Sequence, residues 1–197
     1  MHNIIRNTAL TIALGVLLLS GHEANAEMAV PGPTSQPVGH YEFCKIYPQD
    51  CTQNDIVAKA RLDDRTWQTM LEINDAVNVA IAPRTDEEMH GVPELWSYPT
   101  TEGDCEDYAL LKRYMLEREG FPRSALLITV LRQPSGAGHA VLTVRTDRGD
   151  FILDNLDQRV LDWEDTVYLY LKRQSEKHAG KWVGIADDRG ILVGSVR

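Results

Sequence analysis

The chain has 197 residues and a formal net charge of −9, from 29 acidic and 20 basic side chains. This length is enough for one domain with a sizeable hydrophobic core. The excess of acid argues against nucleic acid or anionic lipid as a partner, because Lys and Arg make those contacts.

The first 26 residues are typical of an export signal. Arg6 supplies a short positive region, residues 9–19 form an apolar run, and residues 24–26 (ANA) offer a small-x-small cleavage site. The run is shorter than the roughly 20 apolar residues of a membrane span, and no later stretch could cross a bilayer. We therefore expect a cleaved signal peptide and a soluble periplasmic product with no membrane span. The alternative is an uncleaved N-terminal anchor.

Residues 27–40 hold three prolines and two glycines and little apolar content. This composition predicts a flexible tether between the cleavage site and a domain that spans residues 41–197.

The chain contains three cysteines, and an odd number in an exported protein indicates a leftover thiol. Cys44 and Cys51 are close in sequence, with Pro48 favouring a turn between them, and an oxidising compartment would let them pair. Cys105 would then stay unpaired, although a long-range disulfide from Cys105 to either of the others remains possible.

Two helices are predicted in the first half of the chain. Residues 54–62 are expected to form a short helix with Asn54 as its N-cap, and apolar spacing of three and four predicts a longer one over 64–81. Asn74 and Asn78 share the apolar face of this second helix, where we expect them to bond buried backbone groups.

A long loop over 84–103 is predicted to lead into a helix from Cys105 to Glu119, closed by Gly120. After this helix the pattern changes to short runs rich in β-branched residues and leucine. Strands are expected at residues 125–132, 139–146, 150–155, 166–173 and 181–185. Helices first and antiparallel strands afterwards predict an α+β fold, with helices packed on one face of the sheet.

Cys105 is the candidate nucleophile. A cysteine in the first turn of a helix feels the positive end of the helix dipole and free backbone N–H groups, which favour the reactive thiolate. The same N–H groups can donate hydrogen bonds to an oxyanion in acyl transfer, and the side chain of Trp96 is a candidate for stabilising the oxyanion with them. The alternative is a small buried cysteine beside a helix start capped by Asp104.

His139 is the candidate base, because it alone among the histidines stands at the head of an apolar strand. Asp154 ends the next strand and could orient it. A two-residue turn at 147–148 pairs Val141 with Asp154 and puts Asp154 on the face of His139, one diagonal step away. A three-residue turn with Gly149 as a bulge puts Asp154 on the other face, unless a second bulge restores it.

The motif GDCEDYA at a helix start, followed by HAVL and ILDN on two strands, resembles the bacterial transglutaminase-like cysteine peptidases. The resemblance covers residues 41–185 and includes the first two cysteines. It implies a papain- and transglutaminase-like fold and a triad of Cys105, His139 and Asp154. It also implies that a peptide bond is hydrolysed through a thioester.

The resemblance further implies calcium bound by Asp104 and Glu106, a cell-surface adhesin as substrate, and an inner-membrane receptor as regulator. Physical chemistry supports the cation, since Asp104, Glu106 and Asp107 oppose ionisation of the neighbouring thiol. Calcium prefers such oxygen ligands and would cancel their charge. The alternative is that the acids only cap the helix.

Two other functions stay open. The same triad could serve an acyl-transfer enzyme of the transglutaminase or amidase kind, which differs in the nucleophile that resolves the thioester. The chain could also be a catalytically inert calcium-binding interaction module.

Overall fold

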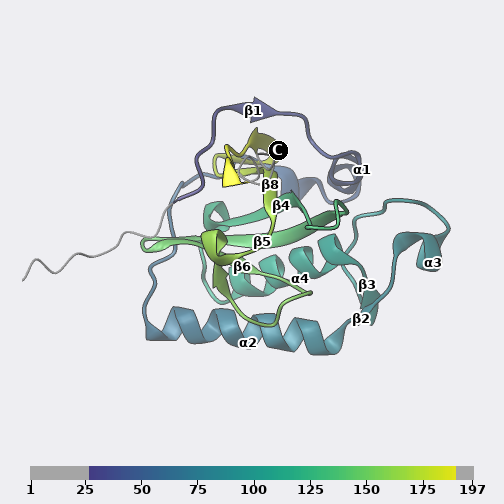
Figure 1. The fold of residues 1–197 in the computed structure, drawn as a ribbon, viewed down its shortest axis with the longest axis horizontal. Coiled ribbons are helices and arrows are strands. Elements are labelled where there is room, and N and C mark those ends of the chain that lie inside the picture. Colours follow the sequence, from purple (N-terminus) through teal and green to yellow (C-terminus); the bar gives the residue numbers. More distant parts are fainter. Residues whose placement is uncertain (1–26, 190–197) are drawn as a thin grey trace, which may run out of the picture.

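The computed structural model describes residues 27–189 and contains a seven-stranded antiparallel sheet in the order β1-β9-β8-β4-β5-β6-β7 (Figure 1). The helices are α1 (Val38–Ile46), α2 (Asp64–Ala80), α3 (Asp86–His90) and α4 (Cys105–Arg118). The strands of the sheet are β1 (Pro33–Thr34), β4 (Leu126–Arg132), β5 (Gly138–Thr146), β6 (Gly149–Leu153), β7 (Leu161–Asp162), β8 (Leu169–Ser175) and β9 (His178–Gly184). Two short strands, β2 (Ala82–Pro83) and β3 (Glu102–Gly103), pair in parallel beside it. The predicted α+β class is confirmed.

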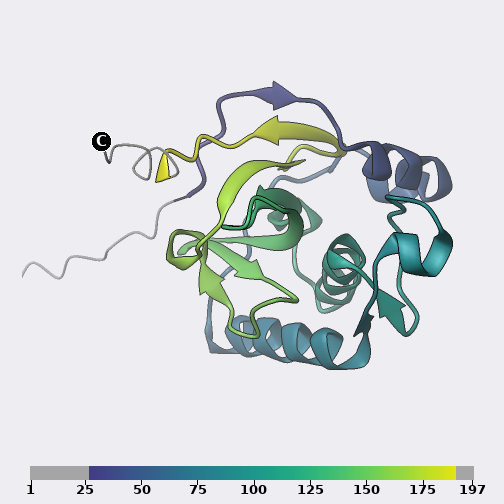
Figure 2. The ribbon, with the colours of Figure 1, turned by 45° about the vertical axis from the view of Figure 1, so that its right-hand side comes forward.

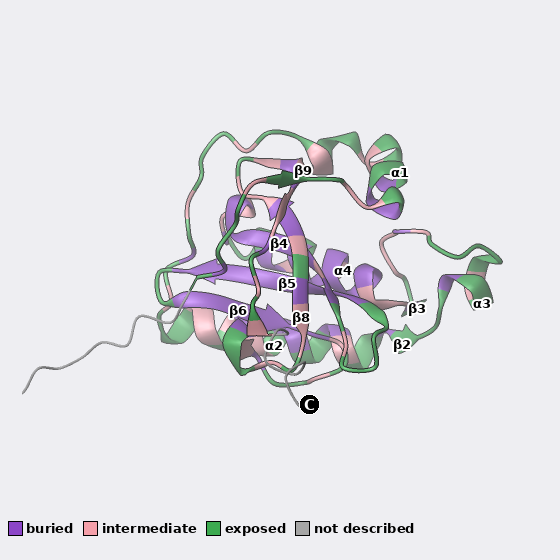
Figure 3. Ribbon diagram, turned by 45° about the horizontal axis from the view of Figure 1, so that its top comes forward, coloured by how far each residue is buried: buried purple, intermediate pink, exposed green. Residues whose placement is uncertain are grey.

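Helix α4 packs against β4 and β5, and α2 packs against α4 on the side away from the sheet (Figures 1 and 2). The main core lies between these layers, and the central strands are its most deeply buried part (Figure 3). A second apolar cluster covers the opposite face of the sheet; it consists of Met28, Leu131, Val141, Ile152, Trp163, Tyr170 and Ile185. No helix within residues 27–189 is long and apolar enough to cross a membrane.

The segment expected to be a tether is instead bound to the domain. Met28 is buried in the second cluster, and β1 pairs with β9 through Pro33 and Thr34. His40 has no exposed surface and belongs to α1. The composition misled because proline and glycine suit an extended edge segment as well as a free linker.

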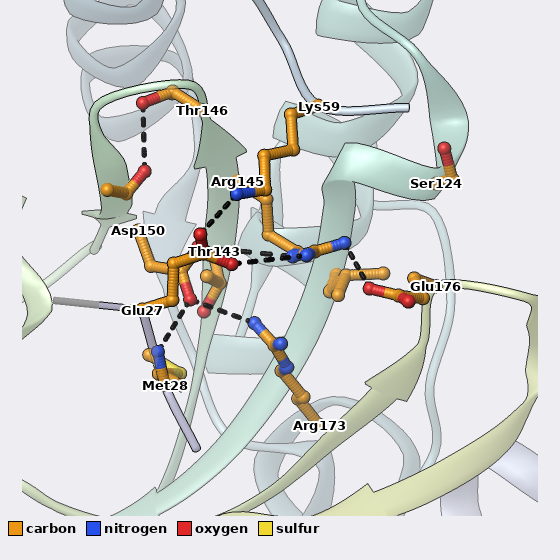
Figure 4. A network of polar contacts seen from close by, with 12 residues as sticks. Glu27, Met28, Lys59, Ser124, Thr143, Arg145, Thr146, Asp150, Arg173 and Glu176 are labelled. Atoms are coloured by element: carbon orange, nitrogen blue, oxygen red, sulfur yellow. Dashed lines mark hydrogen bonds and ion pairs between the residues drawn. The ribbon is translucent and has the colours of Figure 1, made fainter. Parts of the chain in front are cut away.

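A buried polar network holds the start of this segment (Figure 4). Asp150 on β6 accepts a hydrogen bond from the backbone N–H of Met28 and forms an ion pair with Arg173, both at 3.0 Å. Arg145 on β5 lies 4.0 Å from the same carboxylate and also contacts Glu176. The network therefore ties the N-terminal segment to β5, β6 and the end of β8.

The predicted helix over residues 54–62 is wrong. Asn54 does not cap a helix; its side chain donates to the carbonyl of Glu176 at 2.8 Å. Ala60 forms a parallel bridge with Thr146, and its N–H donates to the Arg145 carbonyl at 2.9 Å. These bonds to the sheet replace the bonds of a helix.

The predicted loop over 84–103 contains an element that the sequence analysis missed. Thr85 and Glu88 form a capping box that starts α3, and β2 and β3 pair around it. The spacing of Thr85 and Glu88 is a helix-start signal that could have revealed this helix.

The remaining predicted elements are confirmed with small shifts. Helix α2 starts at a capping box between Asp63 and Thr66, and α4 ends before Gly120, whose φ is +90°. Three of the five predicted strands correspond closely to β4, β5 and β6, whereas β8 begins three residues later than expected, at Leu169, and β9 three residues earlier, at His178. The edge strands β1 and β7 have two residues each, too few to produce an alternating pattern.

Candidate active site

Cys105 is the first residue of α4 and the free cysteine of the described chain, because Cys44 and Cys51 form a disulfide. The disulfides that would join Cys105 to either partner are thereby excluded. Asp104 precedes the helix, but its side chain makes no capping hydrogen bond. The N–H groups of the first turn are thus not used by that carboxylate.

The hairpin between β5 and β6 has the two-residue turn. Thr146 pairs with Gly149, and the register continues without a bulge to Leu142 and Leu153. The next residue, Asp154, therefore lies on the same face of the sheet as His139.

His139 and Asp154 form a buried pair. The Nε2 atom of His139 lies 2.8 Å from Oδ1 of Asp154, and both side chains are 2% exposed. The backbone N–H of Leu156 donates to the same oxygen at 3.0 Å, and Asn78 donates to the Asp154 carbonyl at 2.8 Å. Burial acts to raise the pKa of Asp154, but the hydrogen bond from His139 and the other donors outweigh it and lower that pKa.

The expected role of the two asparagines on α2 is confirmed by the same region. Asn74 donates to the carbonyl of Gln158 at 3.0 Å, as Asn78 does to that of Asp154. Both bonds fasten the loop after β6 to α2, which fixes the position of Asp154.

The thiol of Cys105 lies near the backbone N–H of Ala140, the residue after His139, which acts to lower the pKa of the thiol. The thiol itself donates to Oε2 of Glu106 at 3.2 Å. Burial, together with the negative charge of Glu106, raises the pKa of Cys105 well above its usual value. In this arrangement the thiol proton is therefore directed to Glu106.

Three carboxylates gather beside the thiol. Asp86, Asp104 and Glu106 each place an oxygen within 4.8 Å of the others, and Asp86 and Glu106 are buried. One oxygen of Asp86 and one of Asp104 are buried without a hydrogen-bond partner among residues 27–189. Asp104 and Glu106 were expected from the sequence, whereas Asp86 was missed. The parallel pairing of β2 with β3 brings it close, and its N–H donates to Asp104 at 3.3 Å.

Two acids in the first turn of α4, Glu106 and Asp107, have raised pKa values. Burial and the neighbouring Asp104 raise the pKa of Glu106 to about 9. Burial also raises the pKa of Asp107 to about 7, although a hydrogen bond from the Ser97 N–H opposes the shift. Buried carboxylates with orphaned oxygens are the ligand type that a hard divalent cation takes. The donor set therefore fits calcium.

The indole N–H of Trp96, the expected additional oxyanion donor, already has an acceptor. Its indole N–H donates to Glu94 at 2.7 Å, and its ring packs edge-on against His40 and Trp182. A side chain at Gly39 would meet this indole at 2.4 Å, so the ring is held in the core near α1.

The sequence model of the bacterial transglutaminase-like cysteine proteinases, abbreviated BTLCP, matches residues 30–190. The chain belongs to this family. As a BTLCP protein it is a transglutaminase-like cysteine protease. No curated protein matches the sequence.

Solved structures of LapG from Legionella pneumophila resemble this BTLCP protein. The EGTA-treated LapG structure has 22% sequence identity and a TM-score of 0.52, over 62% of this chain and 68% of that one. The calcium-bound structure has 23% identity and a TM-score of 0.49, over 54% of this chain and 64% of that one. The match thus spans just under two thirds of the calcium-bound LapG chain. The EGTA-treated structure indicates a shared fold.

Proposed function

We propose that this protein is an exported cysteine endopeptidase in which Cys105 attacks a peptide carbonyl, His139 is the base and Asp154 orients that base. The observation that carries the proposal is the buried 2.8 Å bond between His139 and Asp154, with Cys105 near the backbone of Ala140, the residue that follows His139. A buried carboxylate bonded to one ring nitrogen sets the tautomer and leaves the other nitrogen to exchange a proton.

The reaction runs in two steps. His139 takes the thiol proton, and the sulfur of Cys105 attacks the carbonyl carbon to form a tetrahedral oxyanion. When the C–N bond breaks, the proton passes from the imidazolium to the leaving amine, and a thioester remains. Water then gives a proton to His139 and attacks the thioester, which releases the acid and restores the thiol. The N–H groups at the start of α4 would stabilise the oxyanion in both steps.

The Cys105→Ala variant, compared with the wild-type protein, tests this role. Cys105→Ala should abolish cleavage of the substrate and leave the thermal melt nearly unchanged, because only one half-buried sulfur is lost. Iodoacetamide labelling of the folded wild-type protein is the companion measurement. A Cys105 that, with calcium present, reacts no faster than free cysteine at neutral pH would contradict catalysis and favour an inert interaction module. An amine donor in the assay separates hydrolysis, which releases only peptide, from acyl transfer, which incorporates the donor.

Calcium is the proposed cofactor, held by Asp86, Asp104 and Glu106. When bound, the cation would neutralise carboxylates that now oppose ionisation of the thiol. It would also engage Glu106, the present acceptor of the thiol proton. Cys105 would then be free to give that proton to His139. LapG has been solved in a calcium-bound form, which is consistent with this proposal.

Calcium binding is tested with Asp86→Asn, since Asp86 is the ligand that the sequence motif does not contain. We expect wild-type protein to bind calcium in titration calorimetry and to be alkylated at Cys105 faster with calcium than with EGTA. Asp86→Asn should lose both effects. The control is Asp75→Asn, which removes an exposed carboxylate on α2 and should keep both. Equal calcium affinity in Asp86→Asn and wild type would remove Asp86 from the site.

The proposed setting is the periplasm, after cleavage of residues 1–26, which lie outside the described residues. The proposed substrate is a cell-surface protein of the adhesin type, and an inner-membrane receptor is the proposed regulator. These proposals rest on the resemblance of the GDCEDYA, HAVL and ILDN motifs. A comparison of surface proteins from cells with wild-type enzyme or Cys105→Ala tests the substrate, which should gain a new N-terminus only with the wild type.

A further inference from the structure

The carboxylate of Asp154 has a second side-chain partner in addition to His139 and the backbone N–H of Leu156. The hydroxyl of Tyr168, which lies between β7 and β8 in sequence, donates to Oδ2 of Asp154 at 2.5 Å. The Tyr168 ring also packs against the imidazole of His139, with 5.7 Å between ring centroids. One tyrosine thus contacts both members of the buried pair.

The two oxygens of Asp154 have different partners. Oδ1 accepts from His139 and from the N–H of Leu156, whereas Oδ2 accepts from Tyr168. Three bonds on two oxygens fix both the position of the carboxylate and its rotation about the bond to the β-carbon. Without the phenol, only the bonds to Oδ1 would remain, and the carboxylate could turn about that oxygen.

The surroundings of Asp154 offer no equivalent replacement for this phenol. A cavity of about 60 Å³ lies beside it, lined by Asp154, Tyr168, Ile152, Leu161 and Val167, with Asp157 and Arg159 among its polar residues. Arg159 is engaged by Asp157 at 2.7 Å. Lys112, on α4, attracts Asp154 electrostatically but forms no hydrogen bond with it. In the absence of the phenol, Oδ2 would face water in this cavity.

We propose that Tyr168 is a positioning residue of the active site: its hydroxyl locks the Asp154 carboxylate in the orientation that aligns His139 with Cys105. This inference rests on the proposed function. It extends the triad by a fourth residue from outside the strands and makes the segment between β7 and β8 part of the catalytic architecture. A mobile carboxylate would leave the imidazole free to tilt, and alignment is what the base requires.

Tyr168→Phe removes the hydroxyl and keeps the ring. Its matched control is Tyr170→Phe, which removes a buried hydroxyl bonded to Thr166 at 3.0 Å and not to Asp154. With calcium present, we expect the rate of Cys105 alkylation to fall about tenfold in Tyr168→Phe. This factor corresponds to the loss of one hydrogen bond to a charged group. Tyr170→Phe should react like wild type.

A double-mutant cycle with Asp154→Ala shows whether Tyr168 acts through the carboxylate. If it does, the double variant should react at the rate of Asp154→Ala alone. Independent, multiplying losses would overturn the proposal. The downfield proton resonance of the His139 ring N–H is a second readout. It should broaden in Tyr168→Phe as the bond to Asp154 loosens, and stay sharp in Tyr170→Phe.

The two proposals fail in different ways. If wild-type Cys105 reacts like free cysteine even with calcium present, the proposed function is wrong. If wild-type Cys105 is activated and Tyr168→Phe matches it in rate and in the His139 resonance, only the positioning role of Tyr168 is wrong. Should Tyr168→Phe melt at a much lower temperature, the resonance measured below its melting range still decides the question.

Discussion

Lys112 is a charged residue without exposed surface, and its ammonium group has no hydrogen-bond partner among the described residues. It lies on α4 near the ring of Tyr108, 5.9 Å from the ring centroid. Burial lowers the pKa of Lys112 to about 7, and the charge of Asp154 only partly opposes the shift. The folded protein therefore holds this proton more weakly than the unfolded chain does.

This difference predicts how a variant changes stability with pH. Between about pH 7 and the unfolded pKa of 10.5, the unfolded chain binds the Lys112 proton and the folded chain does not, so this contribution to stability rises with pH. The Lys112→Met variant lacks this pH-dependent contribution. We expect the free energy of unfolding of Lys112→Met to exceed that of the wild type by the largest amount below pH 7. This difference should become smaller above pH 7. The decrease should be about 1.4 kcal/mol per pH unit.

The measurement is chemical denaturation of both proteins from pH 6 to pH 9. The difference between them is needed because Glu106 has the opposite dependence. Its folded pKa is raised to about 9, so its contribution is lost as pH rises toward that value. A difference between Lys112→Met and wild type that does not change with pH would mean that Lys112 is not buried as a titrating group.

At the scale of elements, the sequence predicted what periodicity can encode. Helices α2 and α4 and the central strands have long apolar patterns, and the register of β5 on β6 follows from turn length once the two-residue turn is known. Elements held by distant contacts were missed. Residues 54–62 bond to the sheet instead of coiling, and β1 exists only because β9 pairs with it.

The site shows the same division. Cys105, His139 and Asp154 could be proposed from the sequence because each stands at the end of a predicted element. Asp86 and Tyr168 were not predicted. The pairing of β2 with β3 brings Asp86 to the other carboxylates, and the chain segment that leads into β8 brings Tyr168 to Asp154. Such residues carry no local signal beyond their chemistry, so only the tertiary structure could reveal them.

At the scale of the whole molecule, the β5–β6 hairpin has a buried acid near each end. Asp150, near the turn, forms an ion pair with Arg173 and accepts a hydrogen bond from the N–H of Met28, so it holds the N-terminal segment and β8 in place. Asp154, at the open end, is paired with His139. The same hairpin thus connects the network that stabilises the fold with the proposed active site.

This arrangement predicts opposite effects for two alanine variants. Asp150→Ala leaves Arg173 buried without its partner and should lower the free energy of unfolding by about 3–5 kcal/mol. At temperatures where it stays folded, Cys105 should be alkylated at the wild-type rate. Asp154→Ala should slow alkylation strongly, because His139 loses the group that orients it. Denaturant unfolding and iodoacetamide kinetics on the same samples check both. A large loss of Cys105 reactivity in folded Asp150→Ala would show that the two ends of the hairpin are coupled.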